Sequence, residues 1–184
     1  MKEHLLITKI KQNDSYAQRW LYEKYAPVMM SVCMRYVNEW ETARDLLQEG
    51  FIKVFTRIDM YHELENGSFV AWMRRVFATT SLEYLRKHDV LKMHADIDVH
   101  GERMADENCS VLDSLSADEI MVSVGRLPDG YRTVFNLYAI EGYSHQEIAG
   151  MLGIKEATSR SQFLRARKIL QEEILSLLAT KDGK

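Results

Sequence analysis

Basic and polar side chains crowd the stretch from Lys155 to Leu170, and their chemistry is that of a nucleic-acid contact. The stretch holds five Lys or Arg and one Glu, a local net charge of +4. Arginine can clamp a phosphate or bond a guanine edge in two places, and the amide of Gln162 could reach an adenine. The plainer alternative is a solvated basic face on a structural helix. Neighbouring segments must decide between the two.

As a helix, residues 156–170 separate into an inner stripe and an outer arc. Four residues recur at spacings of four, three and four and predict the buried stripe: Ser159, Phe163, Ala166 and Leu170. Small and polar side chains in the first turn would let the outer arc approach base edges closely. The candidate contacts to a DNA groove, at the helix start and along the arc, are Lys155, Ala157, Thr158, Arg160, Ser161, Gln162, Leu164 and Arg165.

A shorter helix is predicted directly before this basic one. Ser144 and Glu147 fit a capping box, in which a serine caps the helix and a glutamate three residues later bonds back to it. Gly153 would make the following turn, and Ile154 would fill the corner. A short helix, a glycine turn and a longer basic helix are the layout of a helix-turn-helix, which favours DNA binding over a merely solvated face.

No arrangement of residues predicts an enzyme. The chain has no glycine-rich phosphate loop and no Ser/His/Asp set on a scaffold that would hold it. His94 and His100 lie near Asp96 and Asp98, but without the regular spacing of metal ligands. We interpret these four side chains as solvated, and we expect neither a metal nor another cofactor.

The composition indicates an all-α protein. The chain has 184 residues, of which 46% are hydrophobic, with only two prolines and nine glycines. It has no apolar run of about 18 residues and no signal-peptide pattern at its start, so membrane insertion is not expected. Cys33 and Cys109 are two lone thiols without a CxxC pair. They indicate a reduced, cytoplasmic protein without a zinc site.

The first domain is expected over residues 1–87 as a succession of helices. Asn13-Asp14-Ser15 supplies capping residues for a long amphipathic run that Pro27 either kinks or restarts. A third helix is predicted over about 40–57, and Ser68 can cap a fourth.

A flexible acidic linker is expected over residues 88–116. From His88 to Ile120 the chain holds nine Asp or Glu and two Lys or Arg, a local net charge of −7, with no sustained period. A second helical domain would follow over residues 117–184. It would hold a helix to about Gly125, a second helix ending near Gly142, and the helix-turn-helix.

Three stretches resemble one family of bacterial transcription factors. The stretch LPDGYRTVFNLYAIEGYSHQEIAGMLGIKEATSRSQFLRARKIL resembles region 4 of the extracytoplasmic-function (ECF) sigma factors of the sigma-70 family. LYEKYAPVMMSVCMRYVNEWETARDLLQEGFIKVF and GSFVAWMRRVFATTSLEYLRKH resemble region 2 of the same family. Together they cover roughly 120 residues, in the family's order. The resemblance implies a non-enzymatic protein that directs RNA polymerase to promoters.

By this resemblance, the third helix would dock on the clamp coiled coil of the polymerase β′ subunit, and region 4 would also meet the β flap. The implied docking residues are Asp45, Leu46, Gln48, Glu49 and Phe51. From the residues alone, a polar outward face beside an apolar stripe suits a basic partner helix, although an ordinary solvated face is the alternative.

The resemblance also places melting of the −10 promoter element on the fourth helix and the loop before it, DMYHELENGS. The implied residues are Tyr61, Phe69, Trp72, Arg74, Arg75, Thr79, Thr80, Glu83, Arg86 and Lys87. The aromatic rings could stack on flipped-out bases and the cations could hold phosphates. For Trp72, its spacing with Val76 favours a place in the core instead. The basic helix of region 4 would read the −35 element.

Four positions depart from the family's common pattern. Thr80 stands where Asn is common, and Glu83 stands where Asp is common. Lys155 replaces a Ser or Pro cap, and Gln162 replaces an Arg. A lysine at a helix start opposes the helix dipole unless a phosphate lies beside it, which agrees with a DNA contact.

The family implies further partners and leaves two competing hypotheses. An anti-sigma factor is expected to hold the protein inactive, the free protein is expected to be a monomer, and the acidic linker is expected to thread toward the polymerase active site. One alternative is a helix-turn-helix regulator that binds DNA without polymerase. The other is a helical adaptor that sequesters a partner protein through its N-terminal domain.

Overall fold

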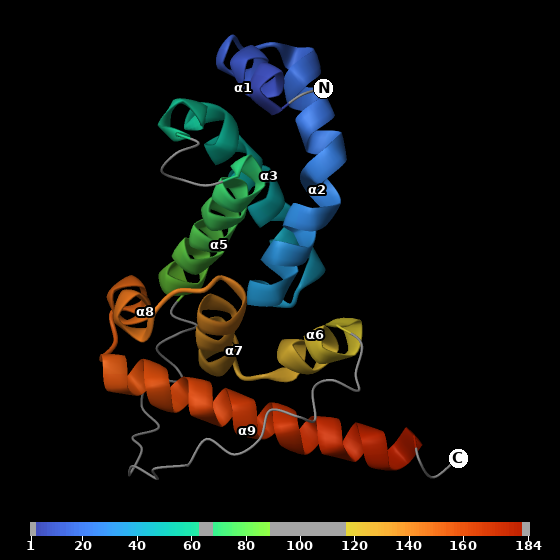
Figure 1. Ribbon diagram of the computed structural model, residues 1–184, viewed down its shortest axis with the longest axis vertical. Coiled ribbons are helices and arrows are strands. Elements are labelled where there is room, and N and C mark those ends of the chain that lie inside the picture. The colour runs from blue at the N-terminus through green and yellow to red at the C-terminus, as the bar shows by residue number, and fades with distance from the viewer. Residues whose placement is uncertain (1–2, 63–67, 89–116, 182–184) are drawn as a thin grey trace. The chain divides into compact units, whose positions relative to one another are not determined.

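The computed structural model describes residues 3–62, 68–88 and 117–181 (Figure 1). All regular structure in these ranges is helical, which confirms the all-α prediction. The chain divides into two compact units, Met1–Leu85 and Arg86–Lys184. The predicted linker, apart from its first residue, lies outside the described residues.

The N-terminal unit is built on a long second helix. The side chain of Asp14 accepts a hydrogen bond from the backbone N–H of Ala17, which starts this helix, and Asn38 ends it in a left-handed conformation. Pro27 lies inside one continuous helix, so the alternative that it restarts the helix is wrong. The elements are α1 (Glu3–Lys11), α2 (Ser15–Val37), α3 (Trp40–Thr56), the 3-10 turn η1 (Ile58–Met60) and α5 (Phe69–Lys87).

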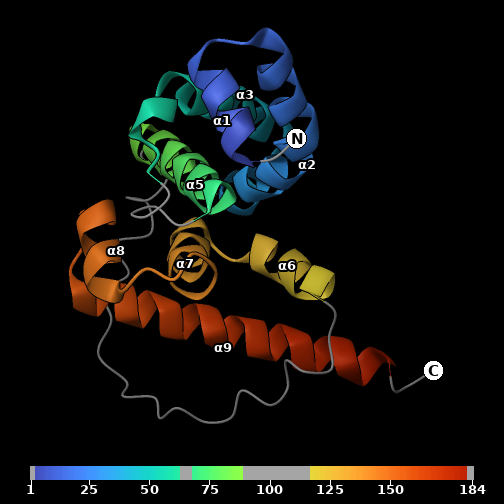
Figure 2. The same ribbon diagram turned by 45° about the horizontal axis from the view of Figure 1, so that its top comes forward.

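Helices α2, α3 and α5 lie side by side around the core of this unit (Figures 1 and 2). The Phe77 ring of α5 is fully buried and meets Phe51 of α3 edge-on, with ring centroids 5.2 Å apart. Gly50 lets the two helices approach at this point, because a Cβ built there would lie 2.2 Å from Phe77 Cε1. Phe51, a member of the apolar stripe predicted on the third helix, therefore packs against α5 and also meets Tyr22 of α2.

The C-terminal unit is a set of short helices along one long helix. In both views α9 runs along α8, α7 and α6 (Figures 1 and 2). The helix predicted to end near Gly142 consists of α7 and a terminal π-helical turn. The basic helix is longer than the predicted 156–170. The elements are α6 (Ala117–Arg126), α7 (Asp129–Phe135), the π turn η4 (Asn136–Ile140), α8 (His145–Leu152) and α9 (Glu156–Lys181).

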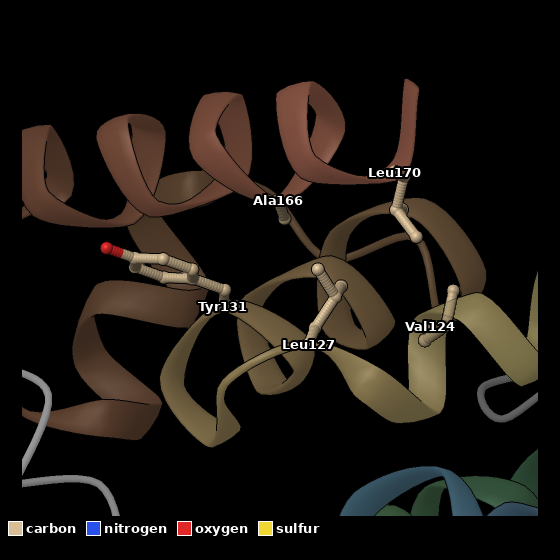
Figure 3. Packing of buried hydrophobic residues seen from close by; sticks show 5 residues of the cluster. All are labelled: Val124, Leu127, Tyr131, Ala166 and Leu170. Carbon is tan, nitrogen blue, oxygen red and sulfur yellow. The ribbon is translucent and has the colours of Figure 1, made fainter. Parts of the chain in front are cut away.

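A compact apolar cluster joins α6 and α7 to the middle of α9 (Figure 3). Its buried members are Val124, Leu127, Tyr131, Ala166 and Leu170. Ala166 and Leu170 belong to the stripe predicted from spacing, and Figure 3 shows them directed at the side chains of the shorter helices. This packing fixes which side of α9 faces outward.

Candidate nucleic-acid interface and docking face

The helix-turn-helix forms with the local geometry that the sequence predicts. Ser144 Oγ accepts from the backbone N–H of Glu147 at 3.3 Å, and the Ser144 N–H donates to Glu147 Oε2 at 2.8 Å, which completes the capping box. Gly153 ends α8 with φ of 68°, a left-handed conformation that glycine adopts without strain. After this turn, α9 begins at Glu156.

An exposed face runs along the first four turns of α9. Ala157, Arg160, Leu164 and Lys168 are exposed and recur every three or four residues, and Lys155 is exposed just before them. The predicted contacts Thr158, Ser161 and Arg165 are half-buried at the edges of this face. The face combines cations with small side chains, as insertion into a major groove requires.

The prediction that Gln162 reaches a base is wrong for this conformation. Gln162 is 8% exposed and lies on the inner side of the helix, where Ser159 is fully buried. The two residues are three apart and therefore share one side of the helix. The spacing predicts one inner residue per turn, whereas a helix in a globular protein buries a wider stripe.

The two arginines of the predicted contact set have different partners. Arg160 forms an i,i+4 ion pair with Glu156, and its side chain is 62% exposed. Arg165 donates from Nη1 to the Tyr131 hydroxyl at 3.1 Å. An exposed pair such as Glu156–Arg160 contributes about 1 kcal/mol or less. Arg160 can therefore exchange its partner for DNA at little cost, while Arg165 is oriented by the domain core.

His145 is a buried contact that the sequence analysis missed. It is 7% exposed, its Nδ1 lies 2.9 Å from Ser159 Oγ, and its ring stacks on Tyr138 with centroids 4.2 Å apart. It thereby joins the first helix of the motif to the start of the second. Burial, followed by the charge of Arg160, lowers the pKa of His145 below its ordinary value.

Acid should weaken the C-terminal unit through His145. Because folding lowers the pKa of His145, the unfolded chain binds the proton first. This stability is present above the ordinary histidine pKa of about 6.5 and is lost as the pH falls below it. We expect the melting temperature of this unit to fall between about pH 7 and pH 5.5, and to fall less in His145→Gln.

Thermal melts followed by circular dichroism at several pH values measure this effect. Tryptophan fluorescence shows which unit unfolds. All three tryptophans, Trp20, Trp40 and Trp72, belong to the N-terminal unit, so their fluorescence does not report unfolding of the C-terminal one. An equally steep pH dependence in the parent and in His145→Gln would exclude His145 as the cause.

The outward face of α3 is acidic and polar, as predicted, but two of its implied residues lie in the core. Asp45, Gln48 and Glu49 are exposed. Leu46 and Phe51 are 2% and 3% exposed, so they cannot touch a partner while α3 is packed. The resemblance assigns roles to a whole helix, whereas the helical repeat turns these two side chains inward.

Two exposed apolar residues on α3 were missed. Trp40 is 59% exposed and Ile52 is 61% exposed. Residues 40, 44, 48 and 52 are spaced by four, so both side chains lie in the row that contains Gln48. Their position outside the buried stripe was the signal in the sequence. Large exposed apolar side chains beside acidic ones make this face a better protein-docking surface than a solvated one.

The three aromatic residues proposed for base stacking pack on one another instead. Tyr61, Phe69 and Trp72 are 5%, 1% and 7% exposed, with ring centroids 5.2 to 5.6 Å apart. The core interpretation of Trp72 is confirmed, and the expectation that Tyr61 and Phe69 present free ring faces is wrong. Of the loop DMYHELENGS, residues 63–67 lie outside the described part of the chain.

The exposed side of α5 carries the cations proposed for the promoter backbone. The exposed cations are Arg74, Arg75, Arg86 and Lys87, and Thr79 is exposed beside them. Glu83 is partly exposed and bonds Lys53 of α3 at 2.7 Å. Thr80 is 2% exposed and its hydroxyl donates to the Val76 carbonyl at 2.8 Å, so a base contact by Thr80 is not available. This hydrogen bond within the helix offsets the free-energy cost of burying the Thr80 hydroxyl.

Other kinds of site find no support in the described ranges. No group of three potential metal ligands occurs there, and none of the described helices is long and apolar enough to cross a membrane. Cys33 is buried, and burial raises the pKa of its thiol to about 12, so it is unreactive. His94, His100 and Cys109 lie outside the described residues.

Two family models match the chain over separate segments. The model of sigma-70 region 2 matches residues 21–90, and the model of sigma-70 region 4 matches residues 117–170. The first covers most of α2 with α3 and α5, and the second covers α6 to α8 and the first part of α9. The two matches follow the order of the two units.

Curated relatives match over nearly the full length. The chain is 24% identical over 188 residues to the ECF RNA polymerase sigma-E factor of Haemophilus influenzae, covering 97% of this chain and 98% of the relative. It is 22% identical to the protein of the same description from Escherichia coli K12, covering 97% of each. Among solved structures it resembles CnrH, determined in complex with the cytosolic domain of CnrY. The identity is 18%, the TM-score 0.50, and the match covers 95% of this chain and 97% of that one.

Proposed function

Because the chain belongs to the sigma-70 family, in its extracytoplasmic-function class, we propose that it binds core RNA polymerase and directs the enzyme to a specific set of promoters. Residues 1–87 act as region 2, residues 88–116 as the linker and residues 117–184 as region 4. The polymerase supplies the chemistry of RNA synthesis, and the protein acts in the cytoplasm, where the polymerase is. The observation that carries the proposal is the pairing, in one chain, of an acidic and apolar docking face on α3 with an exposed basic face on α9.

Core polymerase docks on the outward face of α3. Asp45, Gln48 and Glu49 present acidic and polar groups to a basic partner helix, which is the β′ clamp coiled coil in this family. Trp40 and Ile52 flank them with apolar surface that the partner can bury. Leu46 and Phe51 hold α3 against the core and keep this face in place.

Promoter DNA meets both units. The exposed cations of α5, from Arg74 to Lys87, hold the backbone of the melted −10 element, and the aromatic cluster beneath them supports the helix. In region 4, Arg160 and Lys168 on α9 and Lys155 just before it face the −35 element. By the family resemblance, base choice at −10 falls to the segment DMYHELENGS that precedes α5.

Protein partners regulate this activity. By the family resemblance, an anti-sigma factor holds the free, monomeric protein inactive, and region 4 also contacts the β flap once polymerase is bound. The acidic linker runs toward the polymerase active site, where its negative charge suits a channel built for nucleic acid.

Co-purification tests the docking part of the proposal. The protein should elute with core polymerase in a one-to-one complex on size exclusion. A regulator that acts without polymerase, or an adaptor for some other protein, would elute separately from the core enzyme. Binding of the isolated protein to DNA then separates those two alternatives from each other.

Replacing Arg160 should weaken promoter binding by the polymerase complex. Arg160→Ala removes an exposed cation from the centre of the α9 face. We expect it to weaken promoter binding by about 1 kcal/mol, at the low end for a base contact, because Arg160 must leave Glu156 in order to contact DNA. The matched control is Arg126→Ala, because Arg126 is 64% exposed and also paired to a glutamate, but lies on α6. Competition binding measures both variants. Equal losses would remove Arg160 from the interface.

A further inference from the structure

One ammonium group joins the docking helix to the promoter-facing helix. Lys53 Nζ, on α3, lies 2.7 Å from Glu49 Oε1 one turn earlier and 2.7 Å from Glu83 Oε2 on α5. The Lys53 side chain is only 15% exposed, whereas those of Glu49 and Glu83 are 54% and 43% exposed. A nearly buried cation is thus shared between two carboxylates that an outside partner can reach.

Lys53 keeps its charge in this position. Burial lowers the pKa of Lys53, but hydrogen bonds and charges from Glu49 and Glu83 together outweigh burial and raise the pKa overall. The three side chains therefore carry a net charge of −1, and any group that takes one carboxylate changes what remains for the other.

Glu83 needs a cation beside it if α5 is to hold DNA. Residues 75, 79, 83 and 87 are spaced by four, so Glu83 lies in one row between Arg75 and Lys87. An unpaired carboxylate in that row would repel the phosphates that the arginine and the lysine attract. The bond from Lys53 offsets this repulsion.

Glu49 ties the same ammonium to the docking face. A basic group of the polymerase that bonds Glu49 competes directly with Lys53 for that carboxylate. When a polymerase group bonds Glu49, Lys53 bonds Glu83 alone. The row of residues 75, 79, 83 and 87 on α5 then becomes less negative. Polymerase docking and phosphate binding then favour each other, and this coupling is reciprocal.

We propose that Lys53 is a positioning residue that couples polymerase docking to promoter opening by distributing its ammonium between Glu49 and Glu83. The inference rests on the proposed function, because it needs α3 to meet polymerase and α5 to meet the promoter. It adds to the contact surfaces an internal connection between them.

A double-mutant cycle tests the coupling. With core polymerase at saturation, the equilibrium for open-complex formation is measured for the parent, Glu49→Gln, Glu83→Gln and the double variant. We expect the effect of Glu83→Gln to change about fivefold according to whether Glu49 is intact. In a Lys53→Met background the same two changes should be additive. Additivity with Lys53 present would overturn the proposal.

Two variants separate coupling from a purely structural role. Lys53→Arg should restore the non-additivity, because a guanidinium can bond two carboxylates. If Lys53 had only a structural role, Lys53→Met would lower the melting temperature, and the Glu49 and Glu83 changes would remain non-additive in that variant. Should Lys53→Met unfold the protein, failure of Lys53→Arg to keep the coupling would count equally against the proposal.

A matched control is Arg19→Met, which breaks another i,i+4 pair of 2.7 Å, between Arg19 and Glu23 on α2. It should leave the cycle unchanged. The parent protein distinguishes failure of the proposed function from failure of the role of Lys53. If the parent does not bind core polymerase, the proposed function fails; if it opens promoters but the cycle is additive, only the role of Lys53 fails.

Discussion

Gly50→Ala should lower the free energy of unfolding of the N-terminal unit by about 3 kcal/mol, at the upper end for overpacking a core. The added Cβ would lie 2.2 Å from Phe77 Cε1, far inside van der Waals contact. The Phe77 ring cannot move aside easily, because it is fully buried and already meets Phe51. Helices α3 and α5 would have to separate.

A second glycine provides the control for this change. Alanine is ordinarily better than glycine inside a helix by about 1 kcal/mol. At Gly150, in α8, an added Cβ meets nothing within 4 Å, so Gly150→Ala should be neutral or stabilising. Urea unfolding followed by tryptophan fluorescence reports the N-terminal unit for Gly50→Ala, and circular dichroism reports Gly150→Ala. A Gly50→Ala protein as stable as the parent would show that α3 and α5 are not packed as described.

Asp45→Ala combined with Gln48→Ala should abolish most binding to core polymerase and leave the fold intact. Both side chains are exposed and three residues apart on the outward face of α3. Surface changes of this kind usually alter stability by less than about 0.5 kcal/mol. Polar anchors at a protein interface can contribute about 2 kcal/mol or more, so we expect the affinity to fall roughly 30-fold.

The control pair for this variant is Gln12→Ala with Glu23→Ala. They are likewise one amide and one carboxylate and are also exposed, but Gln12 lies in the turn after α1 and Glu23 lies on α2. Affinity for purified core enzyme is measured beside a melting curve for each protein. If the Asp45 and Gln48 variant melts like the parent and binds polymerase equally well, α3 is not the docking helix.

Elements with a strong local signal were predictable from the sequence. Ser144 and Glu147 form the capping box, Gly153 adopts the left-handed turn, and α3 begins and ends within one residue of its predicted bounds. Each of these depends on side chains within about one helical turn, so spacing is enough to find them.

Side-chain placement that depends on a second helix could not be predicted in the same way. Gln162 and Thr80 are polar and were assigned to contacts, yet packing buries both. Lys53 reaches Glu83 across 30 residues of chain, and Gly50 matters only because Phe77 lies against it. No local pattern carries these pairings, because they arise when α3 and α5 come together.

Promoter-specific transcription tests the central claim most directly. Purified core polymerase is supplied with a promoter library, with and without this protein, and the 5′ ends of the transcripts are sequenced. We expect the protein to produce starts at a defined set of promoters that share −35 and −10 elements, and the Asp45 and Gln48 double variant to produce almost none. Identical transcripts with and without the protein, from a core enzyme that responds to another sigma factor, would contradict the account.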